Sequence, residues 1–227
     1  MSTLPEKNIP RRLIAAATIF LFHSGCYFLS SQIIGWLGLP FYPVALPIDA
    51  HIPLIPLFAI PYVSWFVYLF FGYFLLARKR PRVQRFATAS VLGALVSLAV
   101  FLLFPTHIDR PAVPGGGLIN LTLKIIYAFD ANACNLFPSM HVFMAWLFFI
   151  EMRRRRPARS WLTIGTLGYA LLICAAVLFT RQHYIIDIPA GILLAESCWA
   201  LSRWKRLQRF TDWFWNWVYK KKAAPET

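Results

Sequence analysis

Apolar runs separated by short basic segments make up most of the chain. A membrane-crossing helix needs about 20 mostly apolar residues to span a hydrocarbon layer of about 30 Å. The pattern therefore predicts an all-α fold, a polytopic membrane helical bundle with six transmembrane helices, of which the fourth is the shortest. The predicted helices cover residues 13–36, 56–77, 86–105, 138–153, 160–179 and 184–202.

The first run has the features of a retained helix rather than of a cleaved leader. It is longer than the core of a signal peptide, and the small residues 15–17 precede its apolar stretch, whereas a cleavage site would follow it. We therefore expect an uncleaved first helix. The sequence shows no internal repeat and no low-complexity linker, so residues 1–227 are predicted to form a single domain.

Lys and Arg residues gather between the runs in four groups, and this distribution predicts the orientation. Cytoplasmic loops of membrane proteins carry an excess of these two residues. Placing all four groups on one side requires an even number of crossings and gives an N-in/C-in topology. The groups are Lys7 with Arg11 and Arg12, residues 78–85, residues 153–159, and the tail from Arg203 to Lys222.

The C-terminal segment, residues 203–227, alternates aromatic and polar residues before a run of lysines. Aromatic rings favour the headgroup level of a membrane, and lysines favour anionic lipids. We therefore expect this segment to lie along the cytoplasmic membrane surface. The side chains expected at headgroup level are Trp213, Trp215, Trp217 and Tyr219.

Composition supports a membrane protein and excludes a nucleic-acid-binding one. Charged residues make up 14% of the chain, whereas a soluble domain carries about 25%. The net charge of +14 lies mainly in the predicted cytoplasmic loops, where it favours anionic lipids. We expect contacts with membrane lipids, no nucleic-acid partner, and neither a metal nor another cofactor. The cysteines lack the spacing of metal ligands and are expected to pack as small apolar residues; they are Cys26, Cys134, Cys174 and Cys198.

Three segments are predicted on the opposite side: residues 39–56, a long connection over 106–137, and the turn at 180–183. Connections as long as the second are uncommon in compact domains and often contribute to a site. Within it, residues 118–129 are predicted to form a short interfacial helix. Three glycines at 115–117 precede this helix and form either a hinge or a flexible connector.

Few ionisable residues lie on this outer side, and they are candidate functional residues. Two histidines begin the fourth and sixth predicted helices at the same face, and a carboxylate follows within the sixth. An ionisable group at membrane depth is costly, which indicates a function. The candidates are His141, His183 and Asp187, together with the outer cations Arg110, Lys124 and Arg181.

The spacing of His183 and Asp187, at i and i+4, predicts that they share one helix face. The carboxylate would then accept a hydrogen bond from one ring nitrogen, which makes the other nitrogen a better nucleophile. His141 would enter from a neighbouring helix and donate a proton to the leaving group.

An anion pocket is predicted beside these side chains. Pro138 fits the first turn of a helix, so the N–H groups of Met140 and His141 would face an anion together with the helix dipole. Arginine adds forked donors that suit phosphate oxygens. The set is typical of a phosphoryl-transfer site whose mechanism requires no metal. The predicted phosphate contacts are Arg110, Ser139, Met140, Arg181 and Lys124.

These residues resemble those of the type-2 phosphatidate phosphatase superfamily, which comprises integral membrane lipid phosphatases and phosphotransferases. The family carries the motifs K-x6-R-P, P-S-G-H and S-R-x5-H-x3-D. Here Arg110-Pro111 matches part of the first motif, residues 138–141 (PSMH) match the second, and His183 to Asp187 match the end of the third. The resemblance covers about residues 105–195 and implies a His-His-Asp triad with a phosphohistidine intermediate at His183.

The chain departs from the family pattern at three positions. Leu103 stands where the first motif has Lys, Met140 replaces the Gly of the second, and Val177 replaces the Arg of the third. Arg181 is a candidate to supply the lost charge. The segments FPSMH and QHYIID are similar to the inositolphosphotransferase and sphingomyelin synthase branch, so water and an alcohol both remain possible phosphoryl acceptors.

Simpler interpretations of the same residues also exist. His183 and Asp187 could be a structural pair at a helix start, and a metal site built on them and His141 would lack a fourth ligand. A non-enzymatic channel or scaffold would tolerate His183→Gln. Solvated loop positions are expected for His107 and Asp109, which flank Arg110. Hydrogen-bonded polar residues rather than ligands are expected at His23, Asp49 and His51.

The sequence therefore predicts a metal-independent integral membrane enzyme of lipid metabolism. The first hypothesis is a lipid phosphate phosphatase that hydrolyses a phosphomonoester or pyrophosphate at the extracytoplasmic face. The alternative is a lipid phosphotransferase that moves a phosphoryl headgroup to an alcohol such as inositol or a ceramide-like hydroxyl. The basic loops favour a bacterial inner membrane, with the active site facing the periplasm.

Overall fold

The computed structural model describes residues 9–77, 80–155 and 160–219, and 75% of the chain is helical. The described residues contain no strand, so the all-α prediction is confirmed. Two 3-10 helices, η1 (Pro47–His51) and η2 (Pro56–Phe58), precede α2. The α-helices are α1 (Ile9–Leu37), α2 (Ala59–Leu76), α3 (Arg80–Leu103), α4 (Leu118–Phe129), α5 (Met140–Arg155), α6 (Trp161–Phe179), α7 (Asp187–Leu201), α8 (Lys205–Arg209) and α9 (Asp212–Tyr219).

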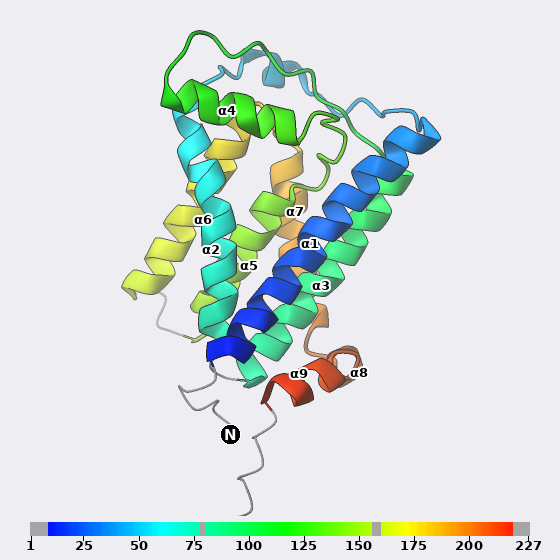
Figure 1. Cartoon of the computed structure of the whole chain (residues 1–227), viewed down its shortest axis with the longest axis vertical. Coiled ribbons are helices and arrows are strands. Elements are labelled where there is room, and N and C mark those ends of the chain that lie inside the picture. Colours follow the sequence, from blue (N-terminus) through cyan, green and yellow to red (C-terminus); the bar gives the residue numbers. More distant parts are fainter. Residues whose placement is uncertain (1–8, 78–79, 156–159, 220–227) are drawn as a thin grey trace, which may run out of the picture.

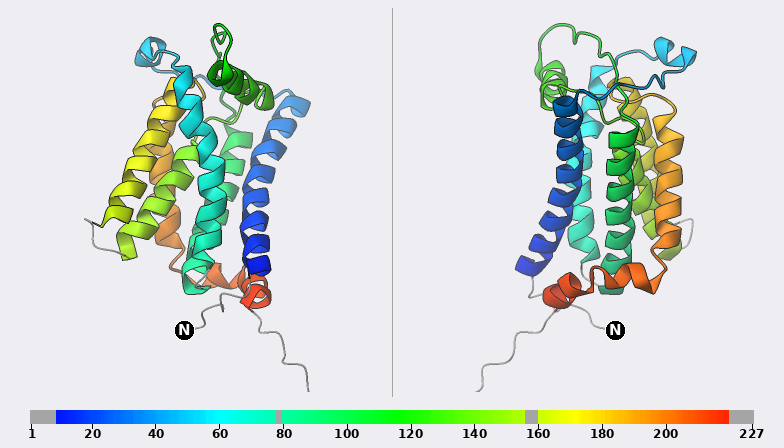
Figure 2. Two further views of the ribbon diagram at one scale, coloured as in Figure 1. Left: turned by 60° about the vertical axis from the view of Figure 1, so that its left-hand side comes forward. Right: turned by 90° about the vertical axis from the view of Figure 1, so that its right-hand side faces the viewer.

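The long helices stand side by side in one bundle with short elements at its two ends (Figure 1). Helix α4 and the segment around η1 lie across one end. Helices α8 and α9 lie at the opposite end, next to the first residues of α1 (Figure 2). The loops that were predicted on one side of a membrane therefore gather at one end of the bundle.

Four helical segments are long and apolar enough to cross a membrane: Ile9–Leu37, Pro56–Leu76, Arg82–Leu103 and Trp161–Phe179. Helices α5 and α7 have 16 and 15 residues, which corresponds to about 24 and 22 Å at 1.5 Å per residue. Both begin later than predicted, because the residues before them form turns rather than helix. Six membrane crossings and their orientation therefore stay a prediction.

The short helix expected over residues 118–129 is confirmed as α4. It begins directly after Gly117, whose φ of 93° lies in a region that glycine adopts readily. Within this helix, Leu123 is fully buried, whereas Leu118 is 80% exposed. The helix thus presents one face to the bundle and one face outward.

The C-terminal segment differs from the prediction at one position. Trp213 and Trp217 are exposed, as expected for residues at headgroup level, but Trp215 is only 1% exposed. The Trp215 ring belongs to the main hydrophobic core together with Val218 of the same helix. Helix α9 therefore packs one face against the bundle, and the expected headgroup position of Trp215 is wrong. The side chain of Tyr219 lies outside the described residues.

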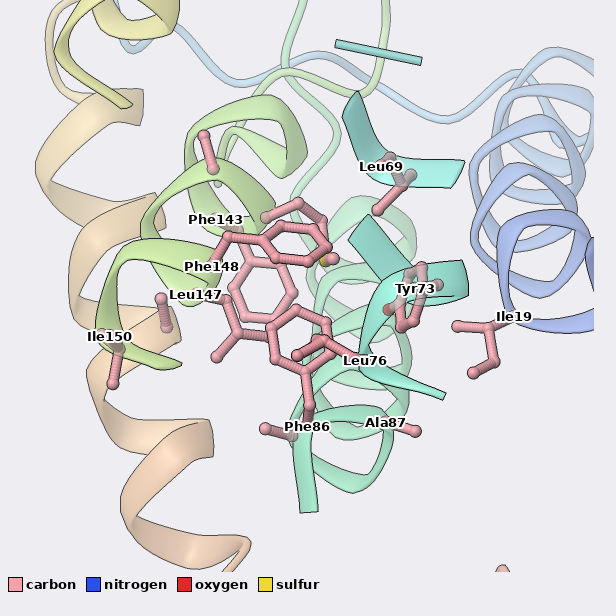
Figure 3. Packing of buried hydrophobic residues seen from close by; sticks show 14 of the residues in the cluster. Ile19, Leu69, Tyr73, Leu76, Phe86, Ala87, Phe143, Leu147, Phe148 and Ile150 are labelled. Atoms are coloured by element: carbon pink, nitrogen blue, oxygen red, sulfur yellow. The ribbon is translucent and has the colours of Figure 1, made fainter. Parts of the chain in front are cut away.

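Aromatic side chains of α5 fill the middle of the bundle and contact α2 and α3 (Figure 3). The ring centroids of Phe86 and Phe148 lie 4.5 Å apart, and those of Tyr73 and Phe86 lie 5.2 Å apart. Glycines face these rings: a methyl group at Gly93 would lie 2.0 Å from the Phe143 ring. Small residues that admit large rings are typical of helices packed within a membrane.

Helices α5 and α7 are in close contact near their N-terminal ends. The Ser139 N–H donates to the Asp187 carbonyl oxygen over 3.3 Å. A methyl group at Gly191 would lie 2.7 Å from the Ser139 carbonyl oxygen, which leaves no room for a larger side chain. At the other end, Arg153 Nη2 donates to Glu196 Oε1 over 2.9 Å. The start of α5 is therefore held in a fixed position relative to the start of α7.

We predict that Gly191→Ala destabilises the protein, because the added methyl group would push α7 away from the backbone of α5. Overpacking of this kind costs about 1–3 kcal/mol. The midpoint of thermal unfolding in detergent should fall by several degrees relative to Gly168→Ala. Gly168 is the matched control, because it also lies in a helix and has no atom within 4 Å of an added methyl group. Equal midpoints for the two variants would contradict the close packing.

Candidate functional site

A cavity of about 410 Å³ is lined in part by α4, the helix that lies across one end of the bundle. Most of the side chains that line it are apolar or aromatic, and they come from α1, α2, α3 and α4. Several of them, including Phe28, Phe66 and Phe129, are also exposed on the outside of the bundle. Polar residues cluster on part of the wall: Tyr27, Asp130, Asn135, His141, Gln182 and His183.

His183 lies in a turn between α6 and α7 rather than in a helix. The carbonyl oxygen of Val177, near the end of α6, accepts hydrogen bonds from the N–H groups of Gln182 (3.0 Å) and His183 (3.1 Å). Asp187 begins α7, and its N–H donates to the Tyr184 carbonyl while its Oδ2 accepts the Tyr184 N–H. This reciprocal pair resembles a capping box and fixes the turn at the helix start.

The prediction that His183 and Asp187 meet is confirmed, although they do not share a helix face. His183 Nδ1 lies 3.0 Å from Asp187 Oδ2. The two side chains are 7% and 0% exposed, so the contact is shielded from water. Because Nδ1 is engaged by the carboxylate, Nε2 is the ring nitrogen that remains for the cavity.

The 39–56 segment braces the turn that carries His183. Asp49 Oδ1 accepts the N–H of Ile185 over 2.9 Å, and Asp49 Oδ2 accepts the N–H of Leu46 over 2.7 Å. The Arg181 guanidinium donates to the carbonyl oxygens of Asp49 (2.6 Å) and Ile52 (3.2 Å). Asp49 is therefore hydrogen-bonded, as expected, and its contacts hold the turn in place.

His141 occupies the first turn of α5 inside an aromatic cage. Its ring centroid lies 4.4 Å from those of Tyr62 and Trp65, and the Trp65 indole N–H donates to the His141 carbonyl over 3.1 Å. The His141 and His183 ring centroids are 6.0 Å apart. His141 Nε2 is buried and has no hydrogen-bond partner within the described part of the chain. The two imidazoles thus share one wall of the cavity.

Ser139 and Met140 form the N-terminus of α5. Ser139 Oγ accepts the Val142 N–H over 3.4 Å, which makes Ser139 the N-cap of the helix. Pro138 lies before this cap and not in the first turn as predicted, because the helix begins at Met140. Among the described residues, the N–H groups of Met140 and His141 have no hydrogen-bond acceptor, so the expected anion-binding donors are present.

Arg110 reaches the polar side of the cavity through a network of hydrogen bonds. Its guanidinium donates to the carboxylate and the carbonyl oxygen of Asp130 and, over 2.6 Å, to Gln182 Oε1. The Asp130 carboxylate also accepts the Tyr27 hydroxyl over 2.6 Å. Asp130 and Gln182 line the cavity, so the guanidinium lies directly behind them.

Tyr127 of α4 joins this network to the His183 turn. The Arg110 guanidinium lies 4.9 Å from the centre of its ring, and its hydroxyl donates to the Thr180 carbonyl over 2.8 Å. Burial raises the pKa of the Tyr127 phenol, and the charges of Arg110 and Arg181 oppose this shift. The phenol therefore keeps its proton and serves as a donor.

Of the five predicted phosphate contacts, Met140 lines the cavity, whereas Arg110, Ser139, Arg181 and Lys124 do not. Arg181 is engaged by the carbonyl oxygens of Asp49 and Ile52, and Lys124 Nζ donates to the Gly115 carbonyl over 2.8 Å. The side chains of Arg181 and Lys124 are thus directed to backbone carbonyl oxygens outside the cavity lining. Position in the sequence was a poor guide for these two residues, because proximity to a motif does not fix the direction of a long side chain.

His107 and Asp109 do not line the cavity, unlike the candidate catalytic histidines. His107 Nε2 lies 3.3 Å from Asp109 Oδ1, and the Asp109 side chain is fully exposed. No group of three or more His, Cys, Asp or Glu side chains in the described ranges has a metal-binding arrangement.

Sequence reasoning missed Asp130 and Gln182 as members of the site. Gln182 directly precedes His183, and its buried Nε2 has no partner among the described residues. Asp130 follows α4, in a long connection that was predicted to contribute to a site. Asp130 is a carboxylate on the outer side, where few cations are present. This feature of the sequence could have identified Asp130 as a site residue.

The comparisons with known proteins agree with this geometry. A family model described as PAP2 superfamily matches residues 32–201, a range that contains both histidines and most of the cavity wall. No curated protein and no solved structure gives a significant match. Members of the family are generally phosphatases or phosphotransferases, and the family and the apolar helices together suggest an integral membrane protein. The chain belongs to the PAP2 superfamily, the type-2 phosphatidic acid phosphatases.

Proposed function

We propose that the protein is a lipid phosphate phosphatase that hydrolyses a lipid phosphomonoester or pyrophosphate through a phosphohistidine at His183. The observation that carries the proposal is the contact of His183 with Asp187 at the wall of an apolar cavity. His141 lies on the same wall, 6.0 Å away between ring centroids. This arrangement provides a nucleophile, a group that orients it, and a proton donor.

In the first step, His183 Nε2 attacks phosphorus and the bond to the leaving oxygen breaks. Asp187 holds the Nδ1 proton and stabilises the positive charge that develops on the ring. Protonated His141 transfers its proton to the leaving alkoxide, which departs as an alcohol. The rings of Tyr62 and Trp65 pack against His141 and hold it at the cavity wall.

In the second step, neutral His141 removes a proton from water. The resulting hydroxide equivalent attacks phosphorus, the bond to His183 Nε2 breaks, and inorganic phosphate leaves. His141 ends the cycle protonated and His183 ends it neutral, so both residues return to their starting states. The proposed mechanism uses no metal.

The charge on the phosphoryl oxygens would be stabilised by donors at the start of α5 and by Arg110. Within the described ranges, the N–H groups of Met140 and His141 have no acceptor, and the Ser139 hydroxyl has its own proton left to donate because its oxygen accepts from Val142. Arg110 is paired with Asp130 in this structure. A phosphate that contacted Arg110 directly would therefore replace Asp130 at the guanidinium.

The lipid part of the substrate is inferred from the apolar wall of the cavity. Phe28 of α1, Phe66 of α2 and Phe129 of α4 line the cavity and are also exposed on the surface of the bundle. A hydrocarbon chain could enter between them from the surrounding membrane, while the phosphate reaches His183. An apolar entrance of this kind favours a lipid over a soluble phosphate ester.

A phosphotransferase is the second candidate. The buried Gln182 Nε2 has no partner among the described residues, and Asp130 and Asn135 add hydrogen-bonding groups to the same part of the wall. Such groups suit the hydroxyl of an alcohol acceptor, which would replace water in the second step. The inositolphosphotransferase and sphingomyelin synthase branch remains a hypothesis on this basis.

We predict that the detergent-purified protein releases inorganic phosphate from a lipid phosphate in the presence of EDTA. The assay offers a panel of lipid phosphates and phospholipids, with and without added alcohols. A new phospholipid that appears only with an alcohol would support the transferase instead. His183→Gln should reduce turnover by at least about a thousandfold, because the nucleophile is lost, and should abolish the trapping of radioactive phosphate on the protein.

His107→Gln is the matched control, because His107 is an outer histidine that does not line the cavity. It should retain turnover and trapped phosphate. Full activity of His183→Gln, or loss of all turnover in EDTA, would refute the proposed metal-free mechanism.

We further propose that the end of the bundle with α4 faces the periplasm of a bacterial inner membrane, with α8 and α9 in the cytoplasm. The expected topology is six spans with both termini inside. In intact cells, a membrane-impermeant maleimide should label Gly116→Cys and should not label Lys205→Cys, in a background without the native cysteines. Both positions are exposed, so lysed cells should show labelling of both. The reverse pattern in intact cells would invert the topology.

A further inference from the structure

Two buried polar residues line the cavity in addition to the proposed catalytic residues. His23 of α1 and Ser97 of α3 line the cavity and are 6% and 1% exposed. His23 Nδ1 and Ser97 Oγ have no hydrogen-bond partner among the described residues. Buried polar atoms are almost always paired, and at membrane depth water is not generally available to pair them. Two unpaired atoms in one apolar cavity therefore indicate a ligand that carries its own polar group.

The His23 ring is held in place by a chain of buried hydrogen bonds. His23 Nε2 pairs with the Ser90 hydroxyl of α3, and Ser90 also pairs with the Tyr73 hydroxyl of α2. Because Nε2 is engaged, Nδ1 is the ring nitrogen that remains for a ligand. Nδ1 is a donor or an acceptor according to the tautomer, and a hydroxyl group can pair with it in either case.

The two atoms lie at different depths along the cavity. His23 lies four residues before Tyr27, and Tyr27 contacts Asp130 at the polar part of the wall. One helical turn, about 6 Å, therefore separates their backbones. Ser97 follows Ser90, the partner of His23, by seven residues, so its backbone lies about 10 Å nearer the end with α4. His23 marks a deep position, and Ser97 marks a shallow one.

We propose that His23 and Ser97 form two hydroxyl-binding points for the hydrocarbon part of the lipid substrate. The protein would then select lipids whose chain carries a hydroxyl group at either of these two positions over lipids with a plain chain. This inference rests on the proposed function, because the phosphate at His183 sets the position of the chain. A plain chain would leave both polar atoms without partners, which is unfavourable.

The test uses long-chain alkyl phosphates in which one hydroxyl group is moved along the chain, with the unsubstituted chain as reference. Dissociation constants are measured with the corresponding non-hydrolysable alkyl phosphonates on the intact protein in detergent. Release of inorganic phosphate from the alkyl phosphates is measured in parallel. The wild type should bind chains hydroxylated at one shallow and one deep position roughly three- to tenfold more tightly than the plain chain.

Two variants serve as controls for each other. Ser97→Ala should remove only the preference for the shallow hydroxyl, and His23→Leu only the preference for the deep one. His23→Leu should also bind the plain chain at least as tightly as the wild type, because the unpaired Nδ1 is removed. Ser30→Ala is the common control: Ser30 is a buried serine of α1 that donates to the Tyr27 carbonyl and does not line the cavity.

Equal affinity of the wild type for all chain positions would overturn the inference, and water would then be the partner of these atoms. A preference that persists in both variants would overturn it as well. These results are distinct from failure of the proposed function. If the proposed function is wrong, no phosphate would be released from any alkyl phosphate, whereas the hydroxylated phosphonates would still bind more tightly than the plain one.

Discussion

The close contact between the first turns of α5 and α7 determines the geometry of the whole site. The Ser139 N–H bonds to the Asp187 carbonyl, and Gly191 leaves space for the backbone of α5. Ser139 is the N-cap of the helix that carries His141, and Asp187 is the hydrogen-bond partner of His183. A displacement of either helix would therefore separate the two imidazoles, although both side chains would remain in the protein.

The buried charges of the site are arranged in pairs and hydrogen bonds, which makes them tolerable in an apolar bundle. Asp187 Oδ2 accepts from His183 and from the Tyr184 N–H, and Arg110 is paired with Asp130. Removing one partner of a buried charge pair costs about 3–5 kcal/mol. The outer loops contribute to stability at this point, because the 39–56 segment and α4 both hydrogen-bond the turn that carries His183. Helix α4 is thus part of the cavity wall, and the 39–56 segment braces the turn beside it.

Much of this arrangement could be predicted from the sequence. The apolar runs predicted the helical class, and the two His-containing segments predicted the convergence of His141, His183 and Asp187. Local spacing was sufficient because both segments start helices at the same end of the bundle. The exact helix starts were not predictable, since Pro138 and His183 lie in turns whose hydrogen bonds come from other elements.

Long side chains were the main source of error. Arg181 is adjacent to the site in sequence, yet it donates to the carbonyl oxygens of a segment about 130 residues earlier. Asp130 and Gln182 are joined at the cavity wall by hydrogen bonds from Arg110, which lies in a different segment from either of them. Trp215 resembled its exposed neighbours, but one face of α9 packs on the core. Such partners depend on tertiary contacts, which spacing within one segment does not encode.

The most direct test of the central claim is an experimental structure with orthovanadate, an analogue of a phosphoryl group in transfer. The account predicts vanadium bonded to His183 Nε2 inside the cavity, with Asp187 on Nδ1 and His141 within hydrogen-bond distance of a vanadate oxygen. Its oxygens should also contact the N–H groups at the start of α5. Vanadate bound elsewhere, or a structure in which His141 and His183 lie on different sides of the bundle, would contradict the account.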